Sequence, residues 1–68
     1  MSARIRVNGK EEESDAITVA ELLASRGISG AKGVAVAVNG AVVPAGSWEQ
    51  SRLASGDQVE IVKPFGGG

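Results

Sequence analysis

The sequence predicts an α+β fold in which a single helix covers one face of one mixed β-sheet. Three observations support this prediction. Helix signals are concentrated in one segment, between residues 17 and 28. Two Asn-Gly pairs, Asn8-Gly9 and Asn39-Gly40, separate strand-like segments, and Asn-Gly is a strong hairpin signal. A last alternating segment, residues 58–63, adds a fifth strand, so the predicted element order is β-β-α-β-β-β.

The first hairpin joins an amphipathic strand to a charged one. Residues 3–7 alternate apolar and charged side chains, so Ile5 and Val7 are expected to face the core. The return strand, residues 10–14, is charged throughout and is typical of an exposed edge, where charge discourages pairing with other chains. Its run of acidic residues, Glu11-Glu12-Glu13, is interpreted as part of this solvated edge and less readily as a surface that steers a basic partner.

The segment between the hairpins combines several local helix signals. Thr18 is a favoured N-cap residue, and Glu21 completes a T-x-x-E capping box three positions later. Ile17 precedes the cap and Leu22 occupies the fourth helical position, which predicts a hydrophobic staple. Gly27 is expected to end the helix as a C′ glycine. The apolar face of the helix is formed by Val19, Leu22 and Leu23.

The second half of the chain is expected to supply three further strands. Residues 34–38 are apolar at every position, which predicts a well-covered strand. Pro44 lacks a backbone N–H and should close the return strand of this hairpin near a sheet edge. Residues 46–56 are mostly polar and are expected to hold a short 3₁₀ or α turn. Two large side chains in that segment, interpreted as plugs for one end of the core, are Trp48 and Leu53.

We expect the first and last strands to pair in parallel at the centre of the sheet. This is the β-grasp, or ubiquitin-like, arrangement. It predicts a β-grasp domain at residues 1–63 and a flexible C-terminal tail at residues 64–68. A last strand at the sheet centre would anchor the chain firmly and leave the C-terminus projecting from the body.

Composition excludes several functional classes. The 68 residues contain no cysteine and no histidine, so an enzyme with its own thiol nucleophile or imidazole base is not expected. Seven basic and eight acidic residues give a net charge of −1, which argues against nucleic-acid binding. No apolar segment approaches the ~20 residues that span a bilayer, and no signal-peptide core follows Met1. We therefore expect a soluble cytoplasmic protein without a bound metal or cofactor.

The chain ends in three glycines, Gly66, Gly67 and Gly68. Glycine lacks a Cβ, so these residues form a thin backbone that ends in a carboxylate. By itself such a tail is most simply a disordered chain end. The other interpretation is that the terminal carboxylate is the reactive group and that the glycines let it enter a narrow site on a partner.

Taken together, these motifs resemble those of the ThiS-type sulfur carriers of thiamine biosynthesis. The resemblance covers nearly the whole chain, and its last part, a terminal diglycine behind a strand and a Gly-Asp turn, is the most specific. The segments that carry it are Ile5-Arg6-Val7-Asn8-Gly9, Thr18-Val19-Ala20-Glu21-Leu22-Leu23, Val34-Ala35-Val36-Ala37-Val38-Asn39-Gly40, Val43-Pro44, Trp48, Leu53, Gly56-Asp57, Glu60-Ile61-Val62-Lys63-Pro64 and Gly67-Gly68. Gly66 is a third glycine before the required pair and should only lengthen the tail.

The resemblance implies a carrier that is a co-substrate and not an enzyme. An E1-like adenylyltransferase of the ThiF type would use ATP to convert the Gly68 carboxylate to an acyl-adenylate. Persulfide sulfur from a donor such as a cysteine desulfurase would then replace AMP and leave a thiocarboxylate. A thiazole synthase of the ThiG type would accept this sulfur. On this interpretation Gly68 carries the sulfur, Gly66 and Gly67 form its slender approach, and ATP is bound by the partner.

Three residues beside the tail are candidates for partner contact. Val62 should point away from the core and could join an apolar docking patch, although an isolated surface valine is common. Pro64 stiffens the start of the tail. Phe65 has two interpretations, an anchor on a partner surface or a cap over the core beneath the last strand.

Two alternatives remain open at this point. One is a related carrier, either the small subunit of a molybdopterin synthase or a sulfur carrier for another pathway. The short chain and the Asn39-Gly40 and Val43-Pro44 pattern favour the thiamine type. The other is a ubiquitin-like interaction module that binds a partner and never carries sulfur.

Overall fold

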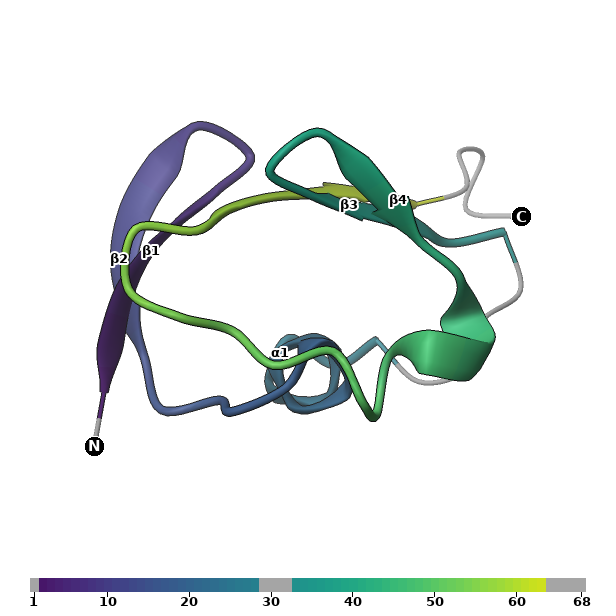
Figure 1. The fold of residues 1–68 in the computed structure, drawn as a ribbon, viewed down its shortest axis with the longest axis horizontal. Coiled ribbons are helices and arrows are strands. Elements are labelled where there is room, and N and C mark those ends of the chain that lie inside the picture. Colours follow the sequence, from purple (N-terminus) through teal and green to yellow (C-terminus); the bar gives the residue numbers. More distant parts are fainter. Residues whose placement is uncertain (1, 29–32, 64–68) are drawn as a thin grey trace.

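The computed structural model describes residues 2–28 and 33–63 of the chain. The element order is as predicted, with a 3₁₀ turn, η1, between the last two strands. The elements are β1 (Ala3–Val7), β2 (Lys10–Ser14), α1 (Val19–Ser25), β3 (Ala35–Val38), β4 (Ala41–Val43), η1 (Ala45–Ser47) and β5 (Gln58–Val62). The strands form one layer and α1 packs across one face of it (Figure 1).

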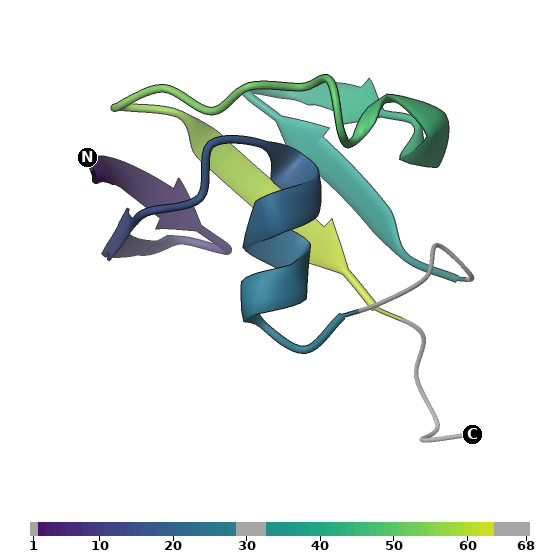
Figure 2. The ribbon, with the colours of Figure 1, turned by 90° about the horizontal axis from the view of Figure 1, so that it is seen from below.

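The five strands form one sheet in the order β2-β1-β5-β3-β4, so the last strand lies at the centre. It pairs in parallel with β1, with Val7 opposite Val59, and antiparallel with β3, with Val36 opposite Ile61. Both hairpins are antiparallel. Figure 2 shows β5 passing behind α1 with one hairpin on either side. This topology confirms the predicted β-grasp arrangement.

Both hairpin turns have the backbone that the Asn-Gly pairs predict. The φ angles are 51° at Asn8 and 86° at Gly9, and 53° at Asn39 and 85° at Gly40. Positive φ at both central residues matches a type I′ turn, whose twist suits the two flanking strands. The local residues therefore determine where each hairpin reverses.

Helix α1 begins and ends through local hydrogen bonds. The Glu21 N–H donates to Thr18 Oγ1 at 3.2 Å, which confirms the N-cap. The carboxylate of Glu21 accepts from the Ile17 N–H at 2.7 Å and not from the Thr18 N–H as a standard capping box would have it. Thr18 is extended and forms an isolated bridge with Arg52, in which the Val19 N–H donates to the Ser51 carbonyl and the Leu53 N–H donates to the Ile17 carbonyl.

The C-terminus of α1 is a Schellman motif. Gly27 has a φ of 78° and its N–H donates to the Ala24 carbonyl at 3.0 Å. The Ile28 N–H donates to the Leu23 carbonyl at 2.9 Å, and Ile28 packs against the core. These two bonds satisfy carbonyls that the end of a helix otherwise leaves unpaired. The helix is thus shorter than the 17–28 segment, because capping residues occupy both ends.

The core lies between α1 and the covered face of the sheet. Within the described residues its buried hydrophobic side chains are Ile5, Val7, Val19, Leu22, Leu23, Val36, Trp48, Val59 and Ile61. Leu53 packs against this core, and the Trp48 Nε1–H donates to the Val43 carbonyl at 2.9 Å. The predicted core role of Trp48 and Leu53 is confirmed.

The expectation that residues 34–38 form a well-covered strand is wrong. Only Val36 in β3 is fully buried, whereas Ala35 is exposed and Ala37 is partly exposed. The single helix covers one face of the sheet, so alternate residues of β3 face outward however apolar they are. No helix among residues 2–28 and 33–63 has the length and apolarity needed to cross a bilayer.

Candidate functional site

The candidate site begins where β5 ends. The residues assigned to the tail (Pro64, Phe65, Gly66, Gly67 and Gly68) lie outside the described residues. Val62 and Lys63 are the last described positions and mark the point from which the tail continues. We call residues 61–63 the tail root. The site is therefore defined by the contacts that hold the tail root in place and by the surface around it.

Alternation along β5 places its side chains on two different faces. Val59 and Ile61 are buried against the core, with exposed fractions of 1% and 8%. Val62 points to the other face and is 60% exposed. The predicted outward orientation of Val62 is confirmed, so the tail root includes one apolar side chain that is exposed to solvent.

Val62 belongs to an apolar area on the uncovered face of the sheet. Residues opposite one another in neighbouring strands share a face. Ala35 lies opposite Val62, and Ala37 lies opposite Val42, which is 75% exposed. We call Ala35, Ala37, Val42 and Val62 the open-face patch; the exposed side chain of Glu60, which lies opposite Ala37 in β5, borders it. This patch lies on the half of the sheet formed by β3, β4 and the end of β5, directly beside the tail root.

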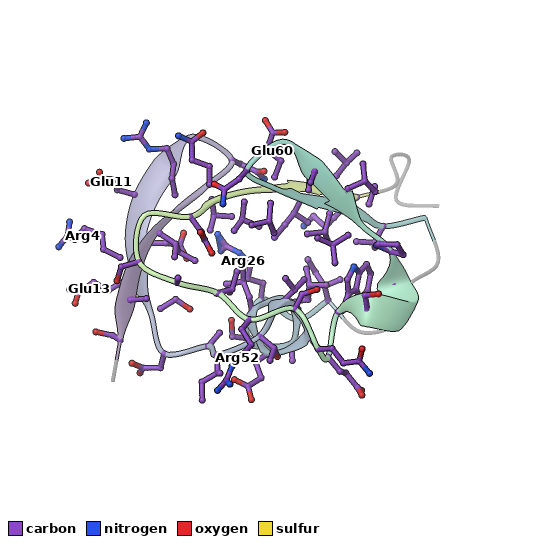
Figure 3. All side chains as sticks on the ribbon, viewed as in Figure 1. Arg4, Glu11, Glu13, Arg26, Arg52 and Glu60 are labelled. Atoms are coloured by element: carbon purple, nitrogen blue, oxygen red, sulfur yellow. The ribbon has the colours of Figure 1, made fainter. Side chains whose placement is uncertain are left out.

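The other half of the uncovered face is charged. Arg4 lies 3.6 Å from Glu11 and 3.9 Å from Glu13, and Arg6 lies 3.4 Å from Glu11. Figure 3 shows Arg4, Glu11 and Glu13 together outside the β1–β2 hairpin. Exposed pairs of this kind contribute only about 0–1 kcal/mol each. Two of the three glutamates of residues 11–13 thus have their charge offset by arginines on the neighbouring strand. This agrees with the interpretation of the acidic run as a solvated edge.

Glu12, the remaining glutamate of the run, connects the sheet to the helix. Arg26, the C-cap residue of α1, donates from Nη2 to Glu12 Oε2 at 2.8 Å. A cation at a helix C-terminus is also favoured by the helix dipole. Beside this pair a hollow of about 450 Å³ borders the tail root, lined by Asn8, Ser25, Arg26, Ile28, Ile61 and Lys63.

The turn residues Asn8 and Asn39 bind the central strand through their side chains. Asn8 Oδ1 accepts from the Ile61 N–H at 2.8 Å, and Asn8 Nδ2 donates to the Ile61 carbonyl at 3.2 Å. At the other end of β5, Asn39 Oδ1 accepts from the Gln58 N–H at 3.0 Å. Sequence reasoning assigned both asparagines to turns and missed these contacts. The signal in the sequence was that both turns carry asparagine. Its side-chain amide can both donate and accept a hydrogen bond, whereas the carboxylate of an aspartate at the same turn could only accept.

The described part of the chain is limited in the groups that it offers for covalent or metal chemistry. The sequence has no cysteine or histidine, and residues 2–28 and 33–63 contain no cluster of three acidic side chains that could hold a metal. The body therefore presents a surface and a fixed strand end.

Comparison with known proteins agrees with the geometry. Residues 3–68 match the ThiS family. The chain is similar to the crystal structure of the thiamine biosynthesis protein ThiS from Geobacter metallireducens, with 32% identity, a TM-score of 0.77 and full coverage of both chains.

A solution NMR structure of a thiamine biosynthesis protein from the same organism is also similar. Its identity is 32% and its TM-score 0.78, with 96% of this chain and 87% of that one covered. No curated protein matches the chain. The family match spans almost every residue, and the similarity to the crystal structure runs over the whole of both chains. The chain therefore belongs to the ThiS family.

Proposed function

We propose that this protein is a sulfur carrier of thiamine biosynthesis that acts in the cytoplasm and carries sulfur on the carboxyl group of Gly68. The observation that carries the proposal is the extent of the family match, which runs through the terminal glycines to residue 68. The central position of β5 supports it, because the strand that leads into the tail is held by a neighbour on each side. The chain is a co-substrate in this scheme and its partners supply the catalytic groups.

The proposed chemistry starts from a poor electrophile. The Gly68 carboxylate attacks the α-phosphorus of ATP on a ThiF-type adenylyltransferase, which forms an acyl-adenylate and releases pyrophosphate. A terminal persulfide sulfur, from a donor such as a cysteine desulfurase, attacks the acyl carbon and displaces AMP. A second thiol then cleaves the resulting acyl disulfide, leaving a thiocarboxylate and a disulfide. The chain has no cysteine of its own that could intercept the activated acyl group.

The open-face patch is the proposed docking surface for the adenylyltransferase. Val42 and Val62 are 75% and 60% exposed, and both lie on the same face as Ala35. Burying such an apolar area is favourable, and the patch lies beside the point where the tail leaves the body. Docking there holds the body while the tail enters the nucleotide site.

An intact-mass experiment tests the proposal. The purified protein is incubated with ATP, a ThiF-type adenylyltransferase and a persulfide donor. We expect the mass increase that corresponds to one oxygen replaced by sulfur, located at Gly68. The variant lacking Gly67-Gly68 and a variant with one alanine added after Gly68 should fold normally and show no such increase. A wild-type chain that remains unmodified beside an active adenylyltransferase would contradict the proposal, as would sulfur transfer by either variant.

A second arm identifies the sulfur acceptor. The thiocarboxylate form is offered separately to a ThiG-type thiazole synthase and to the large subunit of a molybdopterin synthase. Transfer to the thiazole synthase alone is the expected result. Transfer to the other acceptor would move the protein to a different sulfur pathway. A full-length chain that binds its partner but forms no adenylate with it would instead indicate a pure interaction module.

A further inference from the structure

We propose that Asn8 is a positioning residue that fixes the tail root through its side-chain amide, an inference that rests on the proposed function. Asn8 makes three contacts with β5. Its backbone N–H donates to the Val59 carbonyl at 2.9 Å, and its side chain binds both the N–H and the carbonyl of Ile61. Ile61 is two residues before the last described position, so these contacts act directly on the tail root.

The amide replaces the part of the parallel ladder that β1 is too short to form. Arg6 and Asn8 donate their backbone N–H groups to the Asp57 and Val59 carbonyls, both at 2.9 Å, in the usual alternation of a parallel pair. Continuing that alternation would pair Ile61 with the backbone of residues 8 and 10. The chain turns at Asn8, where φ is 51°, so the backbone moves away. Oδ1 and Nδ2 of Asn8 then take those two places.

Without this amide, Ile61 would lack partners on the β1 side of the sheet. In a strand the N–H and the carbonyl of one residue point to the same side, and β3 occupies the opposite side of Ile61. The residue is 8% exposed and its two hydrogen bonds with Asn8 are partly buried, so water replaces them only in part. Unpaired buried peptide groups are unfavourable, so loss of the amide should cause the end of β5 to fray.

Fraying would change how the reactive group is presented. Five residues follow Lys63, but eight follow Glu60, so release of the tail root lengthens the segment between the fixed body and the chain end. The effective concentration of a tethered group falls roughly as the −3/2 power of tether length, which gives a loss of about twofold. Losing the direction in which the chain leaves the sheet adds to that loss.

Asn39 provides a matched control at the other end of the same strand. Its side chain accepts from the Gln58 N–H at 3.0 Å and donates to Asp57 Oδ1 at 3.0 Å. It also follows a strand, precedes a glycine and has a positive φ, 53°. Asn39→Gly and Asn8→Gly therefore remove two side-chain hydrogen bonds each and relieve the same backbone conformation. They differ in their distance from the tail root.

The experiment compares wild type, Asn8→Gly and Asn39→Gly as substrates of a ThiF-type adenylyltransferase, with acyl-adenylate formation measured over a range of carrier concentrations. At saturation we expect the rate constant of Asn8→Gly to be about two to ten times lower than that of Asn39→Gly. The KM values should agree within about twofold because docking uses the open-face patch. Amide hydrogen exchange should show lost protection at Ile61 in Asn8→Gly and at Gln58 in Asn39→Gly.

Asn8→Asp refines the test and serves if the glycine variant does not fold. It keeps the acceptor for the Ile61 N–H but places a carboxylate oxygen against the Ile61 carbonyl in place of the donor, so its rate should also lie below that of wild type. Equal rates for the Asn8 and Asn39 variants, or unchanged protection at Ile61, would overturn the inference and leave the sulfur-carrier proposal standing. A wild-type chain that forms no adenylate at all would overturn the proposed function first, and the role of Asn8 with it.

Discussion

Val62 is the described side chain whose position bears most directly on partner binding. It is the last residue of β5, it is 60% exposed, and the residue opposite it in β3 is Ala35. A buried side chain at this position would serve the core. Under the proposed function, an exposed valine within the tail root would give the adenylyltransferase an apolar contact close to Gly68.

Replacing Val62 by Asp should therefore weaken docking without harming the fold. A carboxylate cannot enter an apolar interface without losing its hydration, so we expect the KM for adenylation to rise about tenfold, equivalent to ~1.4 kcal/mol. The free energy of unfolding should change by no more than about 0.5 kcal/mol, as for most surface substitutions. Steady-state adenylation and urea unfolding of the purified variant measure the two quantities.

Ile17→Asp is the matched control for that variant. Ile17 is an equally large exposed aliphatic residue, 51% exposed, but it precedes helix α1 and lies outside the open-face patch. Its KM should equal that of the wild type. A rise in KM for both variants would indicate a general effect of added negative charge, and no rise for Val62→Asp would remove the patch from the docking surface.

The helix shows which elements can be predicted from sequence alone. Its ends depend on contacts within a few residues, so Thr18, Glu21 and Gly27 were enough to locate both of them. The burial of β3 depends on how many faces of the sheet are covered by helices. The apolar sequence of the strand does not indicate that number. The second roles of Asn8 and Asn39 also escaped prediction, because they bind a strand about fifty and nineteen residues away in sequence.

The candidate site divides in the same way. The outward direction of Val62 could be predicted because it follows from strand alternation, and the role of the terminal glycines stays a prediction. The open-face patch could not be predicted as a unit. It combines residues of three strands, and only the observed register brings Val42 and Ala37 opposite one another on the face that carries Val62.

Gly27, at the turn that ends α1, tests whether the end of the helix is determined by the local backbone conformation. Its φ is 78°, and a Cβ added there would meet no atom within 4 Å. Gly27→Ala should therefore destabilise the protein only through the backbone, by about 1–2 kcal/mol, since side chains disfavour the left-handed region. Gly46→Ala in η1 has the same open surroundings without a positive φ, so its stability should stay within about 0.5 kcal/mol of wild type.

Thermal and urea unfolding of both glycine variants measure the difference. Equal stabilities would mean that the C-cap of α1 relaxes to another conformation at little cost. A large loss in Gly46→Ala would mean that η1 depends on its glycine for a reason other than space or φ.

At the scale of the whole molecule, the described core is complete before the tail begins. Its buried hydrophobic residues run from Ile5 in β1 to Ile61 in β5. Among the described residues, the uncovered face of the sheet is charged over β1 and β2 and apolar over β3 and β4. The body and the last five residues are thus expected to have separate roles, one in recognition and the other in chemistry.

Removing residues 64–68 should separate those roles. Because the buried hydrophobic residues found among residues 2–28 and 33–63 all precede the tail, we expect the chain ending at Lys63 to fold with a free energy of unfolding within about 0.5 kcal/mol of wild type. It should still compete with the full chain for the adenylyltransferase through the open-face patch, and it should accept no sulfur. The measurements are urea unfolding, competition in the adenylation assay and intact mass. A stability loss above about 1.5 kcal/mol would instead assign Phe65 to the core, since burying a large aromatic side chain contributes about that much, and Phe65→Ala in the full chain should then reproduce the loss.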